Sequence, residues 1–244
     1  MSTLVSPGLS KAAITRREDI TSDLWKIWLK PETPFKFKPG QYCTIGLQGM
    51  ERAYSIVSSP YEPEVELFLE LVPRPYGNLT PLLYELGPGD QVDIRPRAKG
   101  LFTLDERYSR HLMMSTVTGV VPYISILRSY LYDLRSGHRF YVLQGASYMD
   151  EFGYAAELER MAREHPAFIS YVPTASRPQE ARNQGWQGET GRVNTLLERY
   201  VDKLCLDREN TLVYGCGHPG MIEDVKKRAA ALDFMVQEER FWKD

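Results

Sequence analysis

Residues 211–232 read TLVYGCGHPGMIEDVKKRAAAL, an apolar run that leads through a glycine-rich turn into a helical pattern. The run TLVYG (211–215) has the length and apolar character of a buried strand, and the helix predicted after the turn covers 219–232. A strand followed directly by a helix is typical of a parallel sheet with crossover helices. The stretch therefore predicts an α/β fold around it.

The same alternation extends back to about residue 110. The predicted strands are HLMMST (111–116), RFYVLQ (139–144) and AFISYV (167–172), and further helices are predicted over 153–164 and 193–204. Another helix begins at Pro122, since proline is favoured at a first helical position. Its apolar positions, Ile124, Leu127, Leu131 and Leu134, recur at helical spacing.

The first hundred residues follow a different pattern, that of short strands separated by turn signals. In residues 65–72, Val65, Leu67, Leu69 and Leu71 alternate with Glu66, Phe68 and Glu70. The neighbouring strand-like runs are LWKIWL, QYCTIGL, RAYSIV and QVDIR, separated by KPG, SSP, PRPYGN and GPGD. This half predicts an antiparallel barrel or sandwich, with domains at 1–105 and 106–244.

Composition narrows the function classes. The chain has 244 residues, 43% hydrophobic and 25% charged, so it can bury a core. A net charge of −2 gives no field for a polyanion, and nucleic acid is not an expected partner. No apolar window reaches the roughly 18 residues of a membrane span or resembles a signal segment, so a cytoplasmic protein is expected.

The cysteines and histidines offer no metal or disulfide framework. Cys43, Cys205 and Cys216 are scattered and odd in number, and the four histidines lack ligand spacing. Cys43 and Cys205 are expected to be inert core residues. No metal is predicted, and redox chemistry would require a bound organic cofactor.

Two short motifs point to ligand contact. GCGHPG (215–220) matches G-x-G-x-x-G in letters but follows the last long strand, so a dinucleotide fingerprint is the wrong label. A tight turn that needs small residues is one explanation, but the position favours ligand contact, because small residues at a strand's carboxyl end let a ligand approach the backbone. In RAYS (52–55), Arg52 and Tyr54 share a strand face suited to an anion beside a flat ring. Alone, they are also typical of a solvated charge and a half-buried aromatic residue.

Taken together, a series of blocks resembles the ferredoxin–NADP reductases of bacteria. The blocks are KPGQY (38–42), RAYS (52–55), GNLTPLL (77–83), TVTGVVPYISIL (116–127), YGCGHPGMIEDV (214–225) and EERFW (238–242). Their order and spacing fit this family from about residue 12 to residue 242. The resemblance implies an N-terminal β-barrel that holds FAD and an α/β domain that holds NADP.

By position, the resemblance implies that Arg52 pairs with the FAD pyrophosphate, Tyr54 lies against the isoalloxazine and Ser55 hydrogen-bonds near flavin N5. Ser55 and Cys216 are the implied catalytic positions, with Cys216 shaping the hydride-transfer geometry and not acting as a nucleophile. The further implied FAD contacts are Ala53, Phe68, Leu69, Glu70, Asn78, Leu79, Thr80, Thr118, Phe241 and Trp242.

The implied NADP contacts are Thr116, Gly119, Ala146, Ser147, Ser176, Arg177, Arg192, Cys216 and Gly217. Ser147, Arg177 and Arg192 occupy the family's positions for the 2′-phosphate, and two of the three are basic here. The chain also departs from the family pattern at Val117 and Val121, where small residues are usual. These valines either narrow the nicotinamide pocket or point into the core.

The resemblance implies electron transfer between NADPH and ferredoxin or flavodoxin through FAD. The sequence leaves the oligomeric state open, with a monomer favoured. Two alternatives stay open: a reductase component of an oxygenase or a general flavin reductase, and a flavin-binding regulatory or interaction subunit with impaired nucleotide turnover. Bleaching of the flavin by NADPH separates an enzyme from a regulatory subunit.

Overall fold

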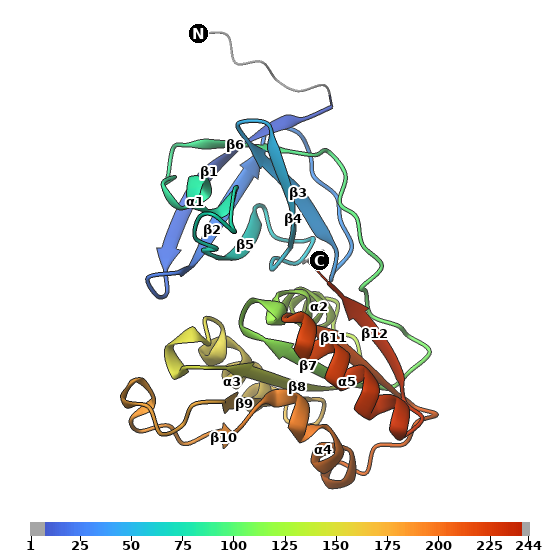
Figure 1. Cartoon of the computed structure of the whole chain (residues 1–244). Helices are drawn as coiled ribbons and strands as arrows, with labels where there is room; N and C mark the ends of the chain where they lie inside the picture. The colour runs from blue at the N-terminus through green and yellow to red at the C-terminus, as the bar shows by residue number, and fades with distance from the viewer. Residues whose placement is uncertain (1–7, 241–244) are drawn as a thin grey trace, which may run out of the picture. The chain divides into compact units, whose positions relative to one another are not determined.

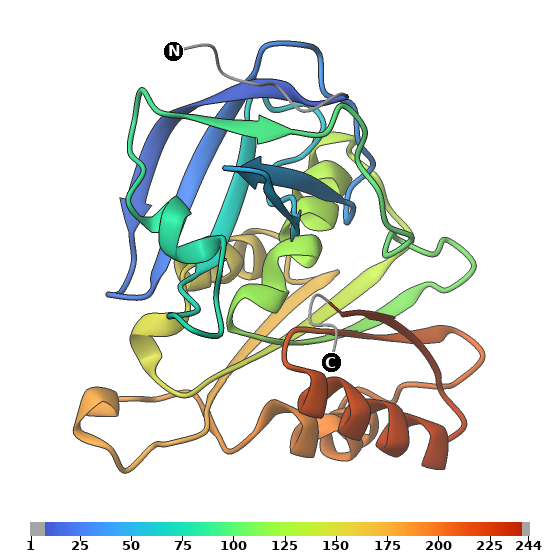
Figure 2. The same cartoon turned by 45° about the horizontal axis from the view of Figure 1, so that its top comes forward.

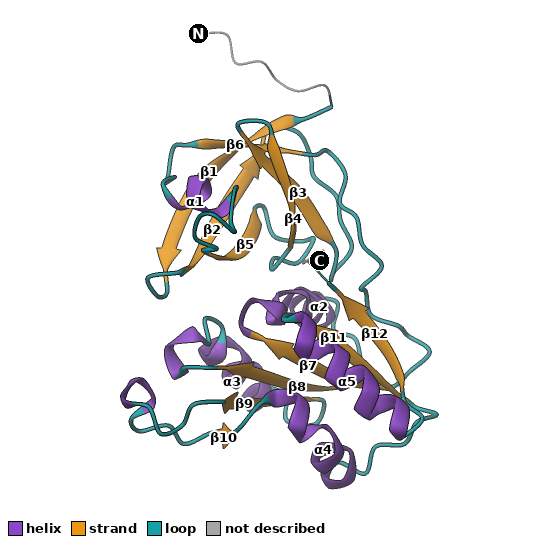
Figure 3. Cartoon of the chain, viewed as in Figure 1, coloured by secondary structure: helices purple, strands orange, loops and turns teal. Residues whose placement is uncertain are grey.

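The computed structural model describes residues 8–240, which form two compact units (Figures 1 and 3). The first unit runs to Leu104 and also takes in Val121–Leu134, and the second contains Asp105–Val120 and continues from Arg135. Each unit has a six-stranded sheet, antiparallel in the first and parallel in the second. The predicted two-domain fold class is confirmed, and the domain limits at 1–105 and 106–244 stay a prediction.

The sheet of the first unit has the strand order β4-β3-β6-β1-β2-β5. Its elements are β1 (Ser10–Asp19), β2 (Leu24–Pro31), β3 (Tyr42–Leu47), β4 (Met50–Ser55), β5 (Val65–Glu70), the short helix α1 (Thr80–Tyr84) and β6 (Gln91–Ile94). The predicted strands all form. β1 was not predicted, because its second half is charged. It is stabilised by antiparallel pairing with β2 on one side and β6 on the other.

The two edge strands of this sheet, β4 and β5, share one core. Tyr54 of β4 packs against a buried cluster that also contains Leu67 and Leu69 of β5. Trp25 and Ile45, from strands between the edges, belong to the same cluster and are almost fully buried. The antiparallel sheet therefore wraps around a single apolar interior, as the prediction of a barrel requires.

Helix α2 (Val121–Tyr132) belongs to the first unit although its sequence follows the first strand of the second. Arg128 bonds the carboxylate of Glu66 at 2.6 Å, and the Glu66 side chain is only 4% exposed. β5 is therefore buried on both faces, and of its two glutamates only Glu70 is exposed to solvent. The prediction that Leu134 lies on the apolar face of this helix is wrong: the helix ends at Tyr132, and Leu134 is 90% exposed with φ +51°.

The second unit is a parallel sheet in the order β10-β9-β8-β7-β11-β12. Its strands are β7 (Arg110–Thr116), β8 (Arg139–Ala146), β9 (Ile169–Ala175), β10 (Glu189–Thr190), β11 (Thr211–Cys216) and β12 (Met235–Glu239). Its helices are α3 (Ala155–Glu164), α4 (Leu197–Lys203) and α5 (Pro219–Ala231), with single turns at η1 (Val117–Val120), η2 (Met149–Glu151), η3 (Ala181–Asn183) and η4 (Val193–Leu196). The strands predicted between residues 111 and 215 all form.

Helices cover both faces of this parallel sheet (Figure 2). α4 and α5 bury one face, where Leu112, Leu143 and Val213 contact Val225 of α5 and Leu197 of α4 within one cluster. α3 lies on the opposite face. The chain steps from β7 to β8 in one direction and places β11 on the other side of β7, so the strand order reverses between β7 and β11. Ligands of open α/β sheets bind at the carboxyl ends of the strands at such a switch point.

Candidate functional site

Two turns meet at the carboxyl ends of β7 and β11, where the strand order of the second unit reverses. The turn after β7 begins at Thr116, and its hydroxyl accepts a hydrogen bond from the His218 backbone N–H at 2.8 Å. A Cβ at Gly119 would lie 2.2 Å from the carbonyl oxygen of Cys216, and a Cβ at Gly217 would lie 2.3 Å from the Thr116 hydroxyl oxygen. Glycines at these two positions are therefore required for the turns to touch.

Gly217 has a second reason to be glycine, because its φ is +124°. The GCGHPG sequence is thus a tight turn after β11 and not a first-strand dinucleotide fingerprint, as expected. It lies at the sheet edge where a ligand is predicted, together with Thr116 and Gly119. Sequence reasoning had placed these residues at the site, and the structure brings them side by side.

Val117 has φ +40°, a left-handed conformation that a β-branched side chain rarely adopts. Its carbonyl accepts a hydrogen bond from Gln144 Nε2 at 3.0 Å, and the Tyr171 hydroxyl donates to Gln144 Oε1 at 2.8 Å. Gln144 is fully buried in β8, so this chain of bonds holds the strained turn from inside the sheet. Thr118 and Gly119 follow on the same turn, whereas Val121 is buried at the start of α2.

Cys216 ends β11 and is fully buried. Burial raises the pKa of its thiol well above the ordinary value, and the Glu239 carboxylate raises this pKa further. A protonated thiol is a poor nucleophile, in agreement with a role in shaping the site and not in covalent chemistry. Burial also raises the pKa of Cys43 to about 12, whereas Cys205 is exposed, so its predicted place in the core is wrong.

The residues predicted for a 2′-phosphate gather at the carboxyl edge of β8 and β9. Ala146 and Ala175 are register partners at this edge, and Ser176 N–H donates to the Ala146 carbonyl at 2.9 Å. Ser147 follows β8, and Arg177 comes two residues after the end of β9.

Arg192 reaches the same edge from further along the chain, because the preceding residue is tied to β9. Gly191 N–H donates to the Ala175 carbonyl at 2.9 Å, and the Gly191 carbonyl accepts from the Thr174 hydroxyl at 2.8 Å. Within residues 8–240, the exposed guanidinium of Arg192 makes no hydrogen bond or ion pair.

A buried asparagine that sequence reasoning missed fastens this edge together. Asn183 is 2% exposed, and its amide donates to the carbonyls of Ser147 at 2.8 Å and Arg177 at 2.9 Å. Its oxygen accepts from Met149 N–H at 2.7 Å. In sequence, Asn183 looks like any polar loop residue, and nothing in the local pattern marks it. Gln144 did carry a signal in the sequence, because it is a polar residue at the end of the apolar run RFYVLQ (139–144).

In the first unit, β4 places Arg52 and Tyr54 on one side of an edge strand. Arg52 is exposed, and the described residues offer its guanidinium one hydrogen bond, to the Glu51 carbonyl at 2.7 Å. Burial raises the pKa of the half-buried Tyr54, while the charge of Arg52 acts to lower it. Ala53 lies between them, and Ser55 is buried at the end of the strand. The arrangement offers a guanidinium with further N–H donors available beside an aromatic ring.

The remaining residues predicted for FAD lie on β5 and at the start of α1. Phe68 and Leu69 are buried and Glu70 is exposed. Asn78 is exposed and Leu79 is in the core, while the Thr80 hydroxyl accepts from Val72 N–H at 3.0 Å and donates to the Val72 carbonyl at 3.2 Å. Phe241 and Trp242 lie outside the described residues.

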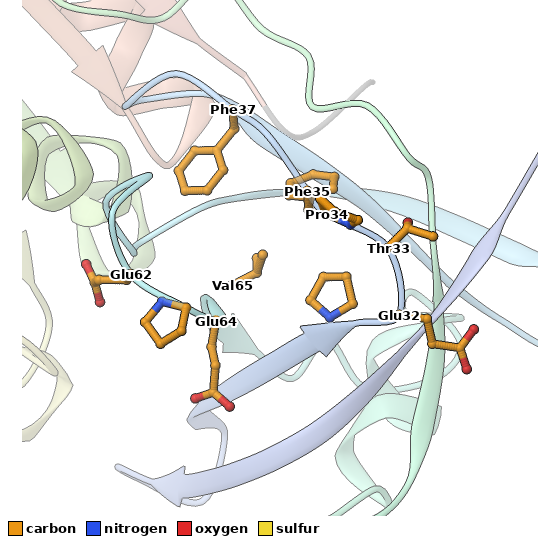
Figure 4. A pocket seen from close by; sticks show the side chains of 10 residues that line it. Glu32, Thr33, Pro34, Phe35, Phe37, Glu62, Glu64 and Val65 are labelled. Carbon is orange, nitrogen blue, oxygen red and sulfur yellow. The ribbon is translucent and has the colours of Figure 1, made fainter.

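A pocket of about 300 Å³ lies elsewhere in the first unit, between the segment after β2 and the loop before β5 (Figure 4). Phe35, Phe37 and Val65 form its apolar walls, and Glu32, Glu62 and Glu64 surround it. None of the predicted site residues lines it. The Glu62 carboxylate is already engaged by Arg128 at 3.2 Å.

Two classes of feature are not found among the described residues. No group of His, Cys, Asp and Glu side chains in residues 8–240 is arranged to hold a metal ion. Within the same residues, no helix has both the length and the apolar character that a membrane crossing requires.

Comparison with known proteins agrees with this geometry. Residues 113–227 match the family model of an oxidoreductase NAD-binding domain. The flavodoxin/ferredoxin–NADP reductase of Escherichia coli is 30% identical over 224 residues, which cover 87% of this chain and 86% of that protein. A ferredoxin–NADP reductase of Pseudomonas aeruginosa is 30% identical over 81% of this chain and 79% of that protein.

A solved structure shows the same fold over nearly the whole chain. The ferredoxin NADP+ reductase of Neisseria gonorrhoeae, with bound FAD and NADP, superposes with a TM-score of 0.83, at 21% identity and with coverage of 97% of this chain and 100% of that one. At 30% identity over most of both lengths, the curated relatives show descent as well as fold. The chain belongs to the flavodoxin/ferredoxin–NADP reductase family.

Proposed function

We propose that this protein is an FAD-dependent oxidoreductase that moves electrons between NADPH and a one-electron carrier protein, ferredoxin or flavodoxin. The observation that carries the proposal is the joined pair of turns at the carboxyl ends of β7 and β11. Their glycines bring backbone to the sheet edge where a dinucleotide binds in α/β folds. Family membership supports the carrier proteins as partners.

The first unit fits FAD. The Arg52 guanidinium has N–H donors available for a pyrophosphate, and planar charge-assisted pairs with phosphate oxygens are strong. Tyr54 offers a ring face beside it, and Ser55 would hydrogen-bond near flavin N5. Ala53, the segments 68–70 and 78–80, Thr118, Phe241 and Trp242 complete the proposed FAD contacts.

The second unit fits NADP. Thr116, Gly119, Cys216 and Gly217 would receive the nicotinamide end, where the small residues leave room for a close approach of the ligand. Ala146, Ser147, Ser176, Arg177 and Arg192 would receive the adenosine end, with Arg192 offering an unengaged guanidinium to the 2′-phosphate. We propose domains at 1–105 for FAD and 106–244 for NADP.

FAD, when bound, supplies the conversion between a two-electron hydride and single electrons. The residues of this chain bind and orient the reacting groups. The protonated thiol of Cys216 contributes volume without a competing negative charge. The Gln144–Tyr171 bonds fix the turn at Val117, and a fixed turn matters because positioning alone contributes several kcal/mol to catalysis.

The test is anaerobic reduction of the flavin in purified, FAD-loaded protein. NADPH should bleach the flavin absorbance, and added oxidised ferredoxin or flavodoxin should restore it. If the flavin stays oxidised with both NADPH and NADH, the result would favour a flavin-binding regulatory or interaction subunit over an enzyme. Bleaching without transfer to either carrier would favour an oxygenase reductase component or a general flavin reductase.

The 2′-phosphate assignment has its own test. Arg192→Ala should raise KM for NADPH and leave KM for NADH nearly unchanged, since only NADPH carries the phosphate. Equal changes for both nucleotides would remove Arg192 from phosphate recognition. A monomer in the cytoplasm is proposed as the working state of the protein.

A further inference from the structure

Three arginines at the carboxyl edge of β8 and β9 are matched there by three carboxylates. Arg177 and Arg182 both lie near the Tyr148 ring, with guanidinium carbons 5.5 Å and 4.2 Å from its centroid. Arg192 is the third arginine. The carboxylates are Asp150, Glu151 and Glu180, and the resemblance to the reductase family had pointed only to the basic side.

Arg177 is held by the acidic side of this cluster. Its Nη1 donates to the Tyr148 hydroxyl at 2.9 Å, and that hydroxyl donates to Glu180 Oε2 at 2.6 Å. The second Glu180 oxygen lies 3.7 Å from the same guanidinium. The bond with Tyr148, followed by the charge of Glu180, raises the pKa of Arg177. An incoming phosphate must therefore compete with Glu180 for this arginine.

Arg182 is neutralised in the same way. Its Nε donates to Asp150 Oδ2 at 2.9 Å, and its Nη1 lies 4.0 Å from Glu151 Oε1. The other oxygen of Glu151 accepts from the backbone N–H groups of Ser147 at 2.8 Å and Tyr148 at 3.1 Å. Those two N–H groups, which follow a strand end, are thus occupied by a carboxylate of the chain.

We propose that Glu180 and Asp150 limit the preference of this protein for NADPH over NADH, so that the two nucleotides bind with affinities within about tenfold of each other. The inference rests on the proposed function and concerns its nucleotide selectivity. NADPH differs from NADH only by the 2′-phosphate, and the cluster that would receive it is balanced in charge. Arg177 and Arg182 would have to break a contact with a carboxylate in order to bind the phosphate, whereas Arg192 would not.

The test replaces Glu180 by glutamine in the FAD-loaded protein and measures the binding of NADP+, NAD+ and 2′-AMP by calorimetry. An exposed charge interaction corresponds to about two- to fivefold in affinity. Glu180→Gln should tighten NADP+ and 2′-AMP by that factor and leave NAD+ unchanged. The gain should shrink in 0.5 M salt, where the Debye length is about 4 Å. Asp150→Asn is the second variant, with the same expected direction.

Glu164→Gln is the matched control. It also removes one carboxylate from an exposed arginine pair, with Arg160 at 3.6 Å, but at the end of α3 and away from the carboxyl edge. Its affinities should equal those of the wild type.

A wild-type preference for NADP+ above about tenfold would overturn the inference, and so would equal shifts for NADP+ and NAD+ in both acidic variants. If neither NADPH nor NADH bleaches the flavin, the proposed function fails instead. In that case the calorimetric affinities still test whether Glu180 weakens the binding of ligands that carry the 2′-phosphate.

Discussion

Replacing Gly119 by alanine tests whether the two joined turns form the working part of the site. The added Cβ would lie 2.2 Å from the Cys216 carbonyl oxygen, 2.6 Å from its carbonyl carbon and 2.8 Å from the Gly217 Cα. All three are backbone atoms, so no flexible side chain can yield, and the turns must separate by about 1 Å. Overpacking of this kind costs about 1–3 kcal/mol in the free energy of unfolding.

The expected effects are both thermal and kinetic. At about 2–4 °C per kcal/mol for a chain of this size, the melting temperature should fall by about 2–12 °C. A displacement of about 1 Å between the turns should also slow flavin reduction by NADPH by about a hundredfold. The FAD content should stay near normal, because Thr118 is the one proposed FAD contact on the displaced turn and the proposed FAD residues of β4 and β5 are untouched. The assays are a thermal melt and stopped-flow flavin bleaching.

Gly215→Ala supplies the control on the same strand. Its Cβ would meet Ile222 at 3.8 Å, which is an ordinary contact, and its φ is not positive. It should melt within a few degrees of the wild type and reduce its flavin at a similar rate. A Gly119→Ala protein with the stability and bleaching rate of Gly215→Ala would refute the argument that these turns must touch.

Three further predictions concern single residues. Burial and the neighbouring His138 lower the pKa of His111 to about 3, so the unfolded state binds the extra proton between pH 6.5 and that value. As the pH is lowered below 6, the free energy of unfolding of the wild type should therefore fall by about 1.4 kcal/mol per pH unit more than that of His111→Phe. Equal pH dependence of the two proteins would refute this. Arg52→Lys should weaken FAD binding in a titration of the apoprotein, because lysine lacks the planar fork; an unchanged Kd would exclude a bidentate contact. Asn183→Ala loses three buried hydrogen bonds and should lower the free energy of unfolding, measured in denaturant, by about 2–4 kcal/mol. A loss below about 1 kcal/mol would contradict the stabilising role of Asn183 at this edge.

Local patterns predicted most of the elements correctly. The apolar runs that became β7 and β11 are buried on both faces, and such runs bounded by turn residues mark parallel strands in sequence. The turn glycines were also readable, because small residues stood where the strands end. Long-range pairing explains why β1 was missed, because its charged second half is held by two neighbouring strands. The end of α2 was missed for a local reason, since the helix ends at Tyr132 and Leu134 adopts a left-handed conformation beyond it.

The sequence by itself determined the order and type of most of the elements, the two-domain fold class and the positions of the glycine turns. Only the tertiary structure decided which side chains meet. It brought Arg182 onto the Tyr148 ring, set Glu180 against Arg177 and placed Asn183 between two strand ends. The contacts of Arg182 with Tyr148 and of Asn183 with Ser147 join residues more than thirty positions apart, so they depend on strand register and on the path of the loop after β9. Hydrogen bonds and charge pairs act over a few ångströms in space, and local periodicity carries no record of that distance.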